Sequence, residues 1–424
     1  MLDIKFIRAE PALVQAGAAK KRIAVDVDAI LALDKQVREL GVVIDDMRSR
    51  QKSASKRIGE APAAERPRLA EEQKREKAAL QEQEREHSAL QARLRELLLR
   101  VPNVPAAEVP EGRDDSENVE VKRWGTPRSF DFEPRDHIAL GELHDWIDVE
   151  RGARIAGSRN YFLKGDLSLL EGAVLRFALD RMVAKGFLPM SVPTLVRSDV
   201  MVGTGYFPGG VEQAYRCDER DDLCLVGTAE VPVTAYHQDE ILDGQSLPRK
   251  YVAWSSCYRR EAGTYGKDTR GLYRVHQFQK VEQVIVDVAD PARSLAHHHD
   301  IVRNAEEVLE AFELPYRVVN VCGGDLGAPQ VQKFDIETWM PSRRAYGETH
   351  SASRFHEYQA RRLNLRYRDP EGVVRVCHTL NNTVAASARM LIALLENHQE
   401  ADGSVRLPAA LRPYMGGRER IGAR

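Results

Sequence analysis

The sequence lacks the long apolar run of a membrane-spanning helix. No uninterrupted apolar stretch in its 424 residues approaches the roughly 20 residues that cross a bilayer. The first residues, MLDIKFIRAE, mix charged and apolar side chains, a pattern that does not fit a secretory signal peptide. These two absences predict a cytoplasmic protein that does not enter a membrane.

A strong charge of one sign is also missing. The 62 lysines and arginines stand against 64 aspartates and glutamates, which gives a net charge of −2. With a hydrophobic fraction of 43%, this balance excludes disorder of the whole chain. A near-neutral total also argues against a nucleic-acid partner, but only if the charges are spread evenly along the chain.

Cysteines are few, and they lack the spacing of a metal site. The chain has five, an odd number, and none of them forms a Cys-x-x-Cys pair: Cys217, Cys224, Cys257, Cys322 and Cys377. This arrangement argues against a disulfide framework and against a structural zinc site. Reduced thiols agree with the expected cytoplasmic location.

The first hundred residues carry a coiled-coil pattern. Apolar residues recur in alternating steps of three and four from Ile30 to Met47, and a second such series runs from Leu80 to Val101. Glycine and proline between positions 59 and 67 interrupt the pattern. The sequence therefore predicts an antiparallel helical hairpin, a projecting arm that should be roughly 50 Å long.

The far end of the first arm helix is strongly basic. Residues 48–57 include no acid and five basic side chains: Arg48, Arg50, Lys52, Lys56 and Arg57. Such a cluster suits contact with a polyanion such as RNA. It is equally typical of a solvated helix end that has no partner, and the charge run alone leaves both readings open.

The remainder of the chain predicts a separate α+β domain. Prolines at 102, 105 and 110 and six acids between Glu108 and Glu120 predict a linker at 106–125, between the arm at 1–105 and a domain at 126–424. Helices are expected at 169–185, 291–312 and 383–398, and strands at 251–258, 274–288 and 316–321. Hairpin-connected strands with helices between them predict an antiparallel sheet flanked by helices.

One strand–loop–strand segment carries most of the chemistry. In the second strand, alternation puts five side chains on one face: Arg274, His276, Phe278, Lys280 and Glu282. Arg259 and Glu261 are expected to share a face of the first strand in the same way. Cations, an aromatic ring and a carboxylate suit phosphate pairing, purine stacking and recognition of a small polar group. A polar edge hairpin is the alternative, although its turn would need no long glycine-rich basic loop.

Two other motifs give only weak indications of a phosphate-binding or metal site. The segment GTYGKDT at 263–269 has neither the spacing nor the Ser/Thr of a phosphate-binding P-loop. Three consecutive histidines at 297–299 could suggest a metal, but neighbouring helical residues point in different directions. We expect those histidines on a solvated helix face, and His350 and His356 in core or hydrogen-bonding roles.

Five stretches, in order, carry a family resemblance. They are GFLPMSVP at 186–193, GTAEV at 227–231, the strand–loop–strand segment at 258–283, GETHS at 347–351 and 379–399. With the N-terminal hairpin, they resemble the bacterial-type seryl-tRNA synthetases, which are class II aminoacyl-tRNA synthetases, over nearly the whole chain. The resemblance implies a class II catalytic domain on an antiparallel sheet. It also implies a homodimer, with a proline of 186–193 at the dimer interface.

The resemblance also implies an activity and its residues. The enzyme would activate L-serine with ATP and transfer the seryl group to serine tRNA, and also to selenocysteine tRNA, with Mg²⁺ as cofactor. Catalytic roles fall to Arg259, Glu261 and Arg389. The serine site would comprise Thr228, Ala229, Glu230, Arg259, Glu282, Asn381 and Thr383. The ATP site would comprise Arg259, Arg260, Glu261, Arg274, Val275, Phe278, Glu348, Thr349, His350, Ser351 and Arg389, and Glu348 and Ser351 would hold the metal.

The arm gains a role by the same resemblance, as a tRNA-binding element whose basic tip contacts RNA and not DNA. Two other readings remain open. One is a class II paralogue that activates an amino acid for a carrier protein, which would not need the arm. The other is a coiled-coil interaction protein with a purely structural core, which would tolerate loss of Arg259.

Overall fold

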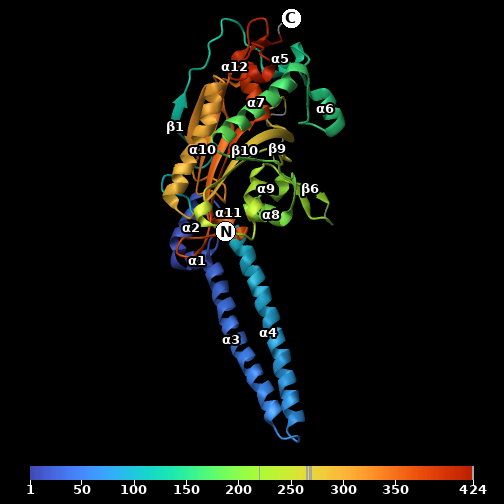
Figure 1. Ribbon diagram of the computed structural model, residues 1–424, viewed down its shortest axis with the longest axis vertical. Helices are drawn as coiled ribbons and strands as arrows, with labels where there is room; N and C mark the ends of the chain where they lie inside the picture. The colour runs from blue at the N-terminus through green and yellow to red at the C-terminus, as the bar shows by residue number, and fades with distance from the viewer. Residues whose placement is uncertain (219, 264–265, 267–269, 423–424) are drawn as a thin grey trace. The chain divides into compact units, whose positions relative to one another are not determined.

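The computed structural model describes residues 1–218, 220–263, 266 and 270–422, together with the backbone but not the side chains of residues 57 and 59 (Figure 1). Part of the basic loop expected at 263–270, including Lys267, lies outside the described residues. The chain forms two compact units. One comprises Met1–Ala19 and Ile23–Pro102, and the other comprises Lys20–Arg22 and Asn103–Arg424.

The first unit is built on the predicted helical hairpin. Two short helices, α1 (Ile4–Ala9) and α2 (Pro11–Lys20), precede the long helices α3 (Val27–Glu60) and α4 (Arg66–Arg100), which run side by side in opposite directions (Figure 1). The Asp26 side chain caps α3 by accepting a hydrogen bond from the Ala29 backbone N–H at 2.9 Å. Helix α4 begins well before the apolar series that starts at Leu80. The hairpin expected from the heptad spacing is confirmed.

The second unit contains an eight-stranded sheet within the described residues, in the order β1-β11-β12-β13-β16-β10-β9-β4. Every neighbouring pair is antiparallel except β4–β9. The strands are β1 (Val119–Trp124), β4 (Leu188–Met190), β9 (Arg249–Tyr258), β10 (Gln277–Asp287), β11 (Tyr316–Asn320), β12 (Gln332–Met340), β13 (Ala345–His356) and β16 (His378–Ala386). The predicted α+β architecture with an antiparallel sheet is confirmed.

Three helices cover one face of this sheet: α7 (Gly165–Ala184), α10 (Pro291–Ala311) and α12 (Ser387–His398) (Figure 1). Alternate residues of β10, including Val281 and Ile285, are buried in the core that these helices share with the sheet. The residues between them, such as Lys280 and Glu282, face the opposite side. Alternation thus places Lys280 and Glu282 on the uncovered face, while Gln283 lies on the helix-covered face and donates to the Ile301 carbonyl of α10.

Shorter elements surround the sheet. The helices are α5 (His137–Leu143), α6 (Val149–Ala156), α8 (Ser198–Thr204), α9 (Glu230–Thr234) and α11 (Tyr358–Arg362). Small sheets pair β5 (Leu195–Arg197), β6 (Tyr215–Asp218) and β7 (Leu223–Leu225); β8 (Ile241–Asp243), β14 (Arg366–Arg368) and β15 (Val374–Val376); β2 (Ile147–Asp148) and β3 (Phe162–Leu163); and β17 (Val405–Arg406) and β18 (Arg420–Ile421). Across the described residues, no helix is both long enough and apolar enough to span a membrane.

Two predicted boundaries are wrong at functionally important places. The strand expected from Arg274 begins at Gln277, because the His276 N–H donates to the Arg159 carbonyl outside the sheet. The helix expected from Thr383 begins at Ser387. The residues before it continue β16, which is buried between β10 and β13. Strand β9 ends at Tyr258, where the expected strand also ends. The strand face expected for Arg259 and Glu261 is wrong, because both residues lie in the loop that follows.

The solvated face expected for the three histidines is wrong for His298. Its side chain is fully buried, and Nε2 lies 2.9 Å from the Ala352 carbonyl oxygen. His297 lies 3.0 Å from the Asp287 carboxylate, and His299 is exposed as expected. Helix α10 packs against β13 and β16 through this turn, which explains why the middle histidine is buried.

Part of the segment expected to be a linker is ordered. Residues 119–124 form β1, which pairs with β11 at the edge of the large sheet. The Cys322 N–H donates to the Asn118 side-chain oxygen at 2.9 Å, which ties the turn before β1 to the segment that follows β11. Helix α4 ends at Arg100, just before Pro102, and the chain from Asn103 onward belongs to the second unit.

Candidate active site

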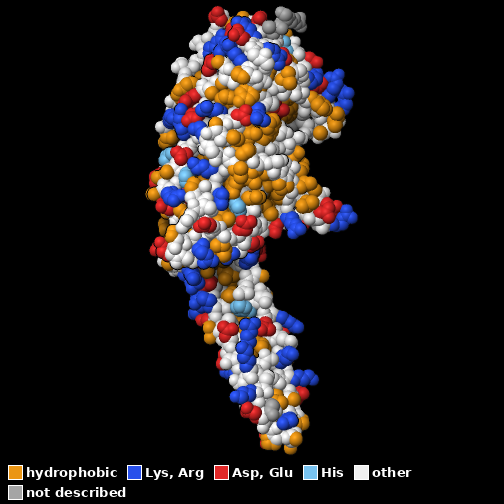
Figure 2. Space-filling view, viewed as in Figure 1, with side chains coloured by type: hydrophobic (Ala, Val, Ile, Leu, Met, Phe, Trp, Pro, Cys, Tyr) orange, Lys and Arg blue, Asp and Glu red, His pale blue; other side chains and the backbone are white. Residues whose placement is uncertain are grey.

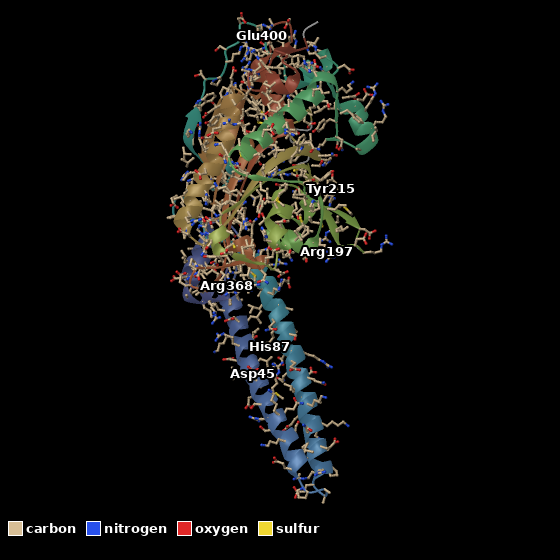
Figure 3. The ribbon with its side chains drawn as sticks, viewed as in Figure 1. Asp45, His87, Arg197, Tyr215, Arg368 and Glu400 are labelled. Atoms are coloured by element: carbon tan, nitrogen blue, oxygen red, sulfur yellow. The ribbon has the colours of Figure 1, made fainter. Side chains whose placement is uncertain are left out.

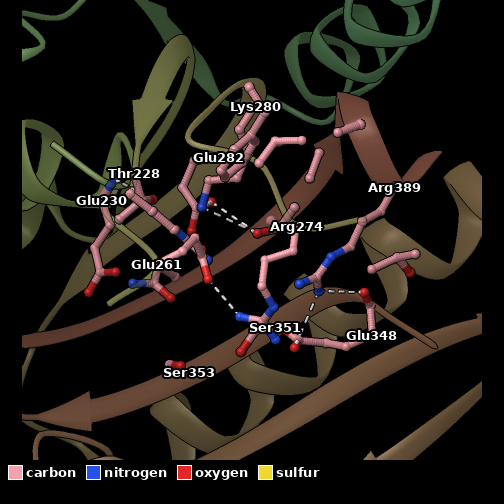
Figure 4. Close-up of a pocket in the computed structure, with 18 of the residues that line it drawn as sticks. Thr228, Glu230, Glu261, Arg274, Lys280, Glu282, Glu348, Ser351, Ser353 and Arg389 are labelled. Atoms are coloured by element: carbon pink, nitrogen blue, oxygen red, sulfur yellow. Dashed lines mark hydrogen bonds and ion pairs between the residues drawn. The ribbon is translucent and has the colours of Figure 1, made fainter. Parts of the chain in front are cut away.

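A pocket opens on the face of the sheet that α7, α10 and α12 leave uncovered (Figure 4). Its walls come from β10, β13, β16, the first residues of α9 and α12, the loops that follow α8, β7 and β9, and the loop before β12. It brings together most of the residues expected from the sequence: Thr228, Glu230, Arg259, Glu261, Arg274, Val275, Phe278, Glu282, Glu348, Thr349, Ser351, Asn381, Thr383 and Arg389. These residues are spread over more than 160 positions of the chain, and the antiparallel sheet makes them neighbours.

A buried ion pair lies at one end of the pocket. Lys280 and Glu282 stand two residues apart on β10, so both point to the same face, and their charged groups are in contact. Both are almost fully buried, at 5% and 2% exposed. Thr383, opposite Glu282 in the sheet register, accepts from Lys280 Nζ and donates to Glu282 Oε2, both at 3.3 Å. This cluster offers a carboxylate, a hydroxyl and an ammonium group to a small polar ligand.

A second carboxylate lies beside this cluster. Glu230, at the start of α9, is 7% exposed, and its backbone N–H donates to the Thr228 hydroxyl at 3.2 Å. Tyr206 donates to one of its carboxylate oxygens and Gln359 to the other. Burial, with the nearby negative charge of Glu282, raises the pKa of Glu230 to about 7. An incoming cation would therefore meet two buried carboxylates.

Arg259 and Phe278 form one wall of the pocket. The guanidinium carbon of Arg259 lies 5.2 Å from the centre of the Phe278 ring. Two bonds fix the backbone of this arginine: its N–H donates to the His276 carbonyl, and His276 Nδ1 lies 2.9 Å from the Arg259 carbonyl oxygen. These contacts hold the loop against the start of β10, so the guanidinium group has a defined position although it lies outside both strands.

Glu261 and Arg274 face each other across the same loop. Arg274 Nη1 lies 2.6 Å from Glu261 Oε2. Glu261 has a backbone φ of 52°, in the left-handed region that side chains other than glycine rarely adopt. The two residues that were expected on separate strand faces therefore form an ion pair at the pocket edge.

Arg389 closes the opposite end. Its guanidinium group lies 4.6 Å from the centre of the Tyr273 ring and donates to the Glu348 carbonyl at 2.6 Å (Figure 4). Its distance to the Glu348 carboxylate is 3.4 Å. Arg343 lies over the Tyr273 ring as well, at 4.1 Å. The flat face of Arg389 is thus held in a fixed plane by an aromatic ring.

Glu348 and Ser351 offer oxygen ligands beside Arg389. They lie on β13, whose register shifts between the pairs Ile336–His350 and Glu337–Glu348. That bulge lets both residues reach the pocket. Desolvation would by itself raise the pKa of Glu348, but the charges of Arg389, Lys333 and Arg259 hold it below its ordinary value. The carboxylate therefore stays ionised and able to bind a cation.

Three expected residues do not line the pocket. Ala229 is fully buried beneath it, the Arg260 side chain is exposed elsewhere, and His350 lies behind it. His350 Nε2 lies 3.2 Å from the Val384 carbonyl oxygen, which confirms the hydrogen-bonding role expected for this histidine. Burial lowers the pKa of His350 to about 4, so this ring is neutral.

Other lining residues were not among the candidate site residues: Tyr206, Tyr273, Lys280, Gln330, Ser353, Ala386 and Ala388. Strand alternation had already placed Lys280 on the correct face, so this signal was present. Tyr206 and Gln330 come from loops, where no periodicity marks which side chains point inward.

The basic residues of the arm tip lie among acids contributed by their own unit. Arg48 contacts Glu84 at 2.8 Å and Asp45 at 3.6 Å, and Arg50 lies 2.6 Å from Asp46. Figure 3 labels Asp45 on α3. Lys52 and Lys56 are exposed, and the Arg57 side chain lies outside the described residues. Figure 2 shows lysine and arginine side chains interspersed with acids along the arm.

Comparisons with known proteins agree with this geometry. Residues 1–105 match the seryl-tRNA synthetase N-terminal domain, and residues 215–398 match the class II tRNA synthetase core domain (G, H, P, S and T). A serine–tRNA ligase of Deinococcus radiodurans is 47% identical over 422 residues, which are 100% of this chain and 99% of the relative. That of Rubrobacter xylanophilus is 44% identical over 423 residues, with 100% and 99% covered.

Two solved structures also resemble this chain over nearly its whole length. The seryl-tRNA synthetase of Pyrococcus horikoshii complexed with ATP superposes with a TM-score of 0.91 at 38% identity, covering 99% of both chains. The cytoplasmic serine–tRNA ligase of Naegleria fowleri in complex with AMP gives 0.87 at 30% identity, covering 99% of this chain and 98% of that one. These matches cover both the helical arm and the unit that carries the antiparallel sheet and the pocket. The chain therefore belongs to the seryl-tRNA synthetases, class II enzymes that charge serine onto tRNA.

Proposed function

We propose that the pocket binds ATP and L-serine together and joins them as seryl-adenylate, after which the seryl group passes to the 3′ end of serine tRNA. In the first step the serine carboxylate attacks the α-phosphorus of ATP and pyrophosphate leaves. In the second, a hydroxyl of the terminal ribose attacks the seryl carbonyl carbon and AMP leaves. Both steps depend on positioning and on charge stabilisation, so no side-chain nucleophile is needed.

Serine recognition is assigned to the buried end of the pocket. The Glu282 carboxylate and Thr383 hydroxyl bind the substrate hydroxyl, and Glu230 and Thr228 bind its ammonium group. Alanine would leave the buried Glu282, Lys280 and Thr383 groups without their ligand partner, which is costly. Threonine would need room for one more methyl group. Ala229 and Asn381 shape the same end of the site.

ATP occupies the part of the pocket that lies beyond the serine end. Arg259, beside the serine end, pairs with the α-phosphate, and Glu261 and Arg274 line the approach to it. The adenine ring lies between Phe278 and Arg389, near Val275. The plane in which Tyr273 holds the Arg389 guanidinium group supports this stacking. Arg260, Thr349 and His350 belong to the outer or supporting part of the ATP site.

Mg²⁺ fits this donor set as a partner of the ATP phosphates. Among the described residues, no three His, Cys, Asp or Glu side chains form a cluster that could hold a metal. Mg²⁺ prefers oxygen ligands and commonly keeps water and substrate phosphate in its shell, so one carboxylate and one hydroxyl suffice. Glu348 and Ser351 would hold it, and the ion would neutralise charge on the phosphates.

The observation that carries the proposal is the buried Lys280–Glu282–Thr383 cluster, because it is built to pair with one small hydroxyl. In a serine-dependent ATP–pyrophosphate exchange assay, Glu282→Ala should lower kcat/KM for serine by about a hundredfold or more, as expected for the loss of a charged hydrogen-bond partner. Glu371→Ala, at an exposed loop residue, should not change the rate. Wild-type exchange by Glu282→Ala would contradict the assignment.

The wider assignments follow the family. Residues 1–105 form a tRNA-binding arm and 126–424 the catalytic domain. Arg48, Arg50, Lys52, Lys56 and Arg57 are candidate contacts to serine tRNA and selenocysteine tRNA. We place the enzyme in the cytoplasm.

A homodimer is part of the same proposal. Exposed apolar side chains on and beside α7, β4 and β9, namely Leu169, Val183, Leu188 and Trp254, support it. Figure 2 shows apolar side chains gathered over this part of the catalytic unit. Sedimentation of the purified chain tests it, and a monomer at micromolar concentration would contradict it.

A further inference from the structure

The carboxylate of Glu230 is held by two side chains to which no role has been given. Tyr206 donates from its hydroxyl to Glu230 Oε2 at 2.8 Å, and Gln359 donates from Nε2 to Glu230 Oε1 at 2.7 Å. Each oxygen of the carboxylate thus accepts one hydrogen bond from a side chain of the protein. Gln359 is fully buried and lies behind the described pocket lining, so its effect on a ligand has to pass through Glu230.

The surrounding bonds allow only one orientation of the Gln359 amide. Its Oε1 accepts from the Thr379 hydroxyl at 2.7 Å, and its Nε2 donates to the Thr204 carbonyl at 2.9 Å as well as to Glu230. A flipped amide would set its oxygen against the Thr204 carbonyl and the Glu230 carboxylate, two acceptors. The donor that faces Glu230 is therefore fixed by β16 and α8.

The loop that carries Tyr206 is fastened by the same helix that carries Gln359. Arg362 of α11 donates to the carbonyl oxygens of Val202 and Phe207, at 2.9 and 3.1 Å. Both donors to Glu230 are thus positioned by α11, one directly and one through this loop. Their separation from Glu230 in sequence, 24 and 129 residues, shows that the arrangement is tertiary.

We propose that Tyr206 and Gln359 are positioning residues that keep Glu230 ionised and aimed at the ammonium group of the amino-acid substrate, so that they set the affinity for serine and its dependence on pH. The inference rests on the function proposed above. It adds to it two residues, a tyrosine at the pocket wall and a glutamine behind it, that act through a third.

The electrostatics around Glu230 explain why such support is needed. From β10, the negative charge of Glu282 opposes ionisation of Glu230 and the positive charge of Lys280 favours it, while burial opposes it most strongly. Arg259 faces Tyr206 from the loop after β9, and α11 presents the uncharged Gln359. The hydrogen bonds from Tyr206 and Gln359 lower the pKa of Glu230, yet it stays near 7. Loss of either donor would remove one of these hydrogen bonds and raise the pKa of Glu230 further.

The test is the pH profile of kcat/KM for serine in ATP–pyrophosphate exchange, measured from about pH 5.5 to about pH 9 with wild type, Tyr206→Phe and Gln359→Met. Wild type should lose activity toward acid with a midpoint near 7. Each variant should move that midpoint up by about one unit, the shift produced by a tenfold weaker stabilisation of the ionised form. Activity of each variant should recover at high pH, and the KM for ATP should not change.

Two controls separate positioning from a general structural effect. Glu230→Gln has no group to titrate, so its activity should stay low without recovery at high pH. Gln399→Met removes another fully buried amide, which bonds to the Arg135 carbonyl and lies outside the pocket lining among the described residues. It should lower stability without moving the midpoint.

The outcomes are distinguishable. Unmoved midpoints in both variants, or a KM for ATP that rises together with that for serine, would overturn the positioning role. Absence of serine-dependent exchange by wild type would instead overturn the proposed function. If Gln359→Met does not fold, Tyr206→Phe, which loses a single oxygen atom, still decides the question.

Discussion

At the scale of single residues, the site depends on charges that are buried but paired. Lys280 and Glu282 are both almost inaccessible to solvent, and each would be expensive to bury alone. Glu230 has hydrogen-bond donors but no direct cation among its described contacts. The site therefore holds one carboxylate that is paired with a cation and one that has hydrogen-bond donors only, and the proposed function assigns the first to the serine hydroxyl and the second to its ammonium group.

The ion pair makes a prediction about stability. Lys280→Met should destabilise the fold by about 3–5 kcal/mol, because it leaves the Glu282 charge buried without its partner. The double variant Lys280→Met/Glu282→Gln should recover a substantial part of that loss, since both charges are then absent. Urea denaturation of the single and double variants measures the difference. Equal stabilities of the two would show that Glu282 does not depend on Lys280.

Buried histidines make a prediction about pH. Burial lowers the pKa of His298 and His356 to about 3, and those of His378 and His398 to about 4. These rings stay neutral in the folded chain while the unfolded chain takes up protons below about pH 6.5. Their contribution to stability is therefore complete above that pH and is lost as the pH falls toward 4.

His298 allows this to be tested. In wild type the free energy of unfolding should fall as the pH is lowered from 6.5 to 5. Each histidine that is protonated in the unfolded chain but neutral in the folded chain should contribute up to about 1.4 kcal/mol per pH unit. His298→Gln should reduce that slope by about one histidine's share, although it is less stable at neutral pH. Denaturant titrations at several pH values give the slope, and an unchanged slope would contradict the buried neutral state.

At the scale of elements, the site is a product of strand alternation and of the loops that interrupt it. Strand β10 contributes Phe278, Lys280 and Glu282 from one face, and β16 continues into the region expected to be helical, so that Thr383 pairs with Glu282 in the register. The loop before β10 then determines where Tyr273 and Val275 lie. A tight turn at Gly271 is central to that loop.

Gly271 therefore gives an element-scale prediction. Its φ is +76°, and an added Cβ would lie 2.2 Å from Nε2 of His137, the atom that accepts a hydrogen bond from the Leu272 N–H. Gly271→Ala should lower the free energy of unfolding by about 3 kcal/mol, because the alanine adopts a left-handed backbone conformation and its Cβ is overpacked against His137. It should also raise the KM for ATP, because Tyr273 and Val275 follow directly.

Gly263→Ala is the matched control. Its φ is +79°, but no described atom lies within 4 Å of the added Cβ. Gly263→Ala should therefore lose only the free energy of placing an alanine in the left-handed region, about 1–2 kcal/mol. Thermal unfolding and denaturant titration compare the two, and equal losses would show that the His137 contact can relax.

At the scale of the whole molecule, the chain forms two compact units of different architecture. The N-terminal unit is a helical hairpin with a surface of mixed charge, and the other holds the large sheet and the pocket. A net charge of −2 hides this division, because acids gather at 108–120 while basic residues gather at the arm tip and around the pocket loop. The near-neutral total is therefore no argument against an RNA partner.

Deletion of Val27–Arg100, with a short linker in its place, tests the division. Serine-dependent ATP–pyrophosphate exchange should stay close to wild type, because the described lining of the pocket lies wholly in the other unit. Charging of serine tRNA should be abolished, since the candidate RNA contacts are removed. Aminoacylation with labelled serine measures the second activity, and charging that survives the deletion would contradict the tRNA-binding role of the arm.

The amino-acid sequence by itself determined the features that depend on local periodicity. Heptad spacing was enough to predict the α3–α4 hairpin, and two-residue alternation was enough to place Lys280 and Glu282 on one face of β10. These patterns work because helices and strands repeat over short distances. The residue assignments at the pocket came from resemblance to a family, since Arg259, Glu348 and Arg389 share no local pattern.

Only the tertiary structure decided the contacts between distant segments. It paired Glu261 with Arg274, kept Thr383 in a strand, buried His298 and brought Gln359 to Glu230 across 129 residues. No local rule contains these results, because burial and hydrogen-bond partners come from the packing of one element against another. The support of Glu230 by Tyr206 and Gln359 belongs to this second kind, and the folded chain alone reveals it.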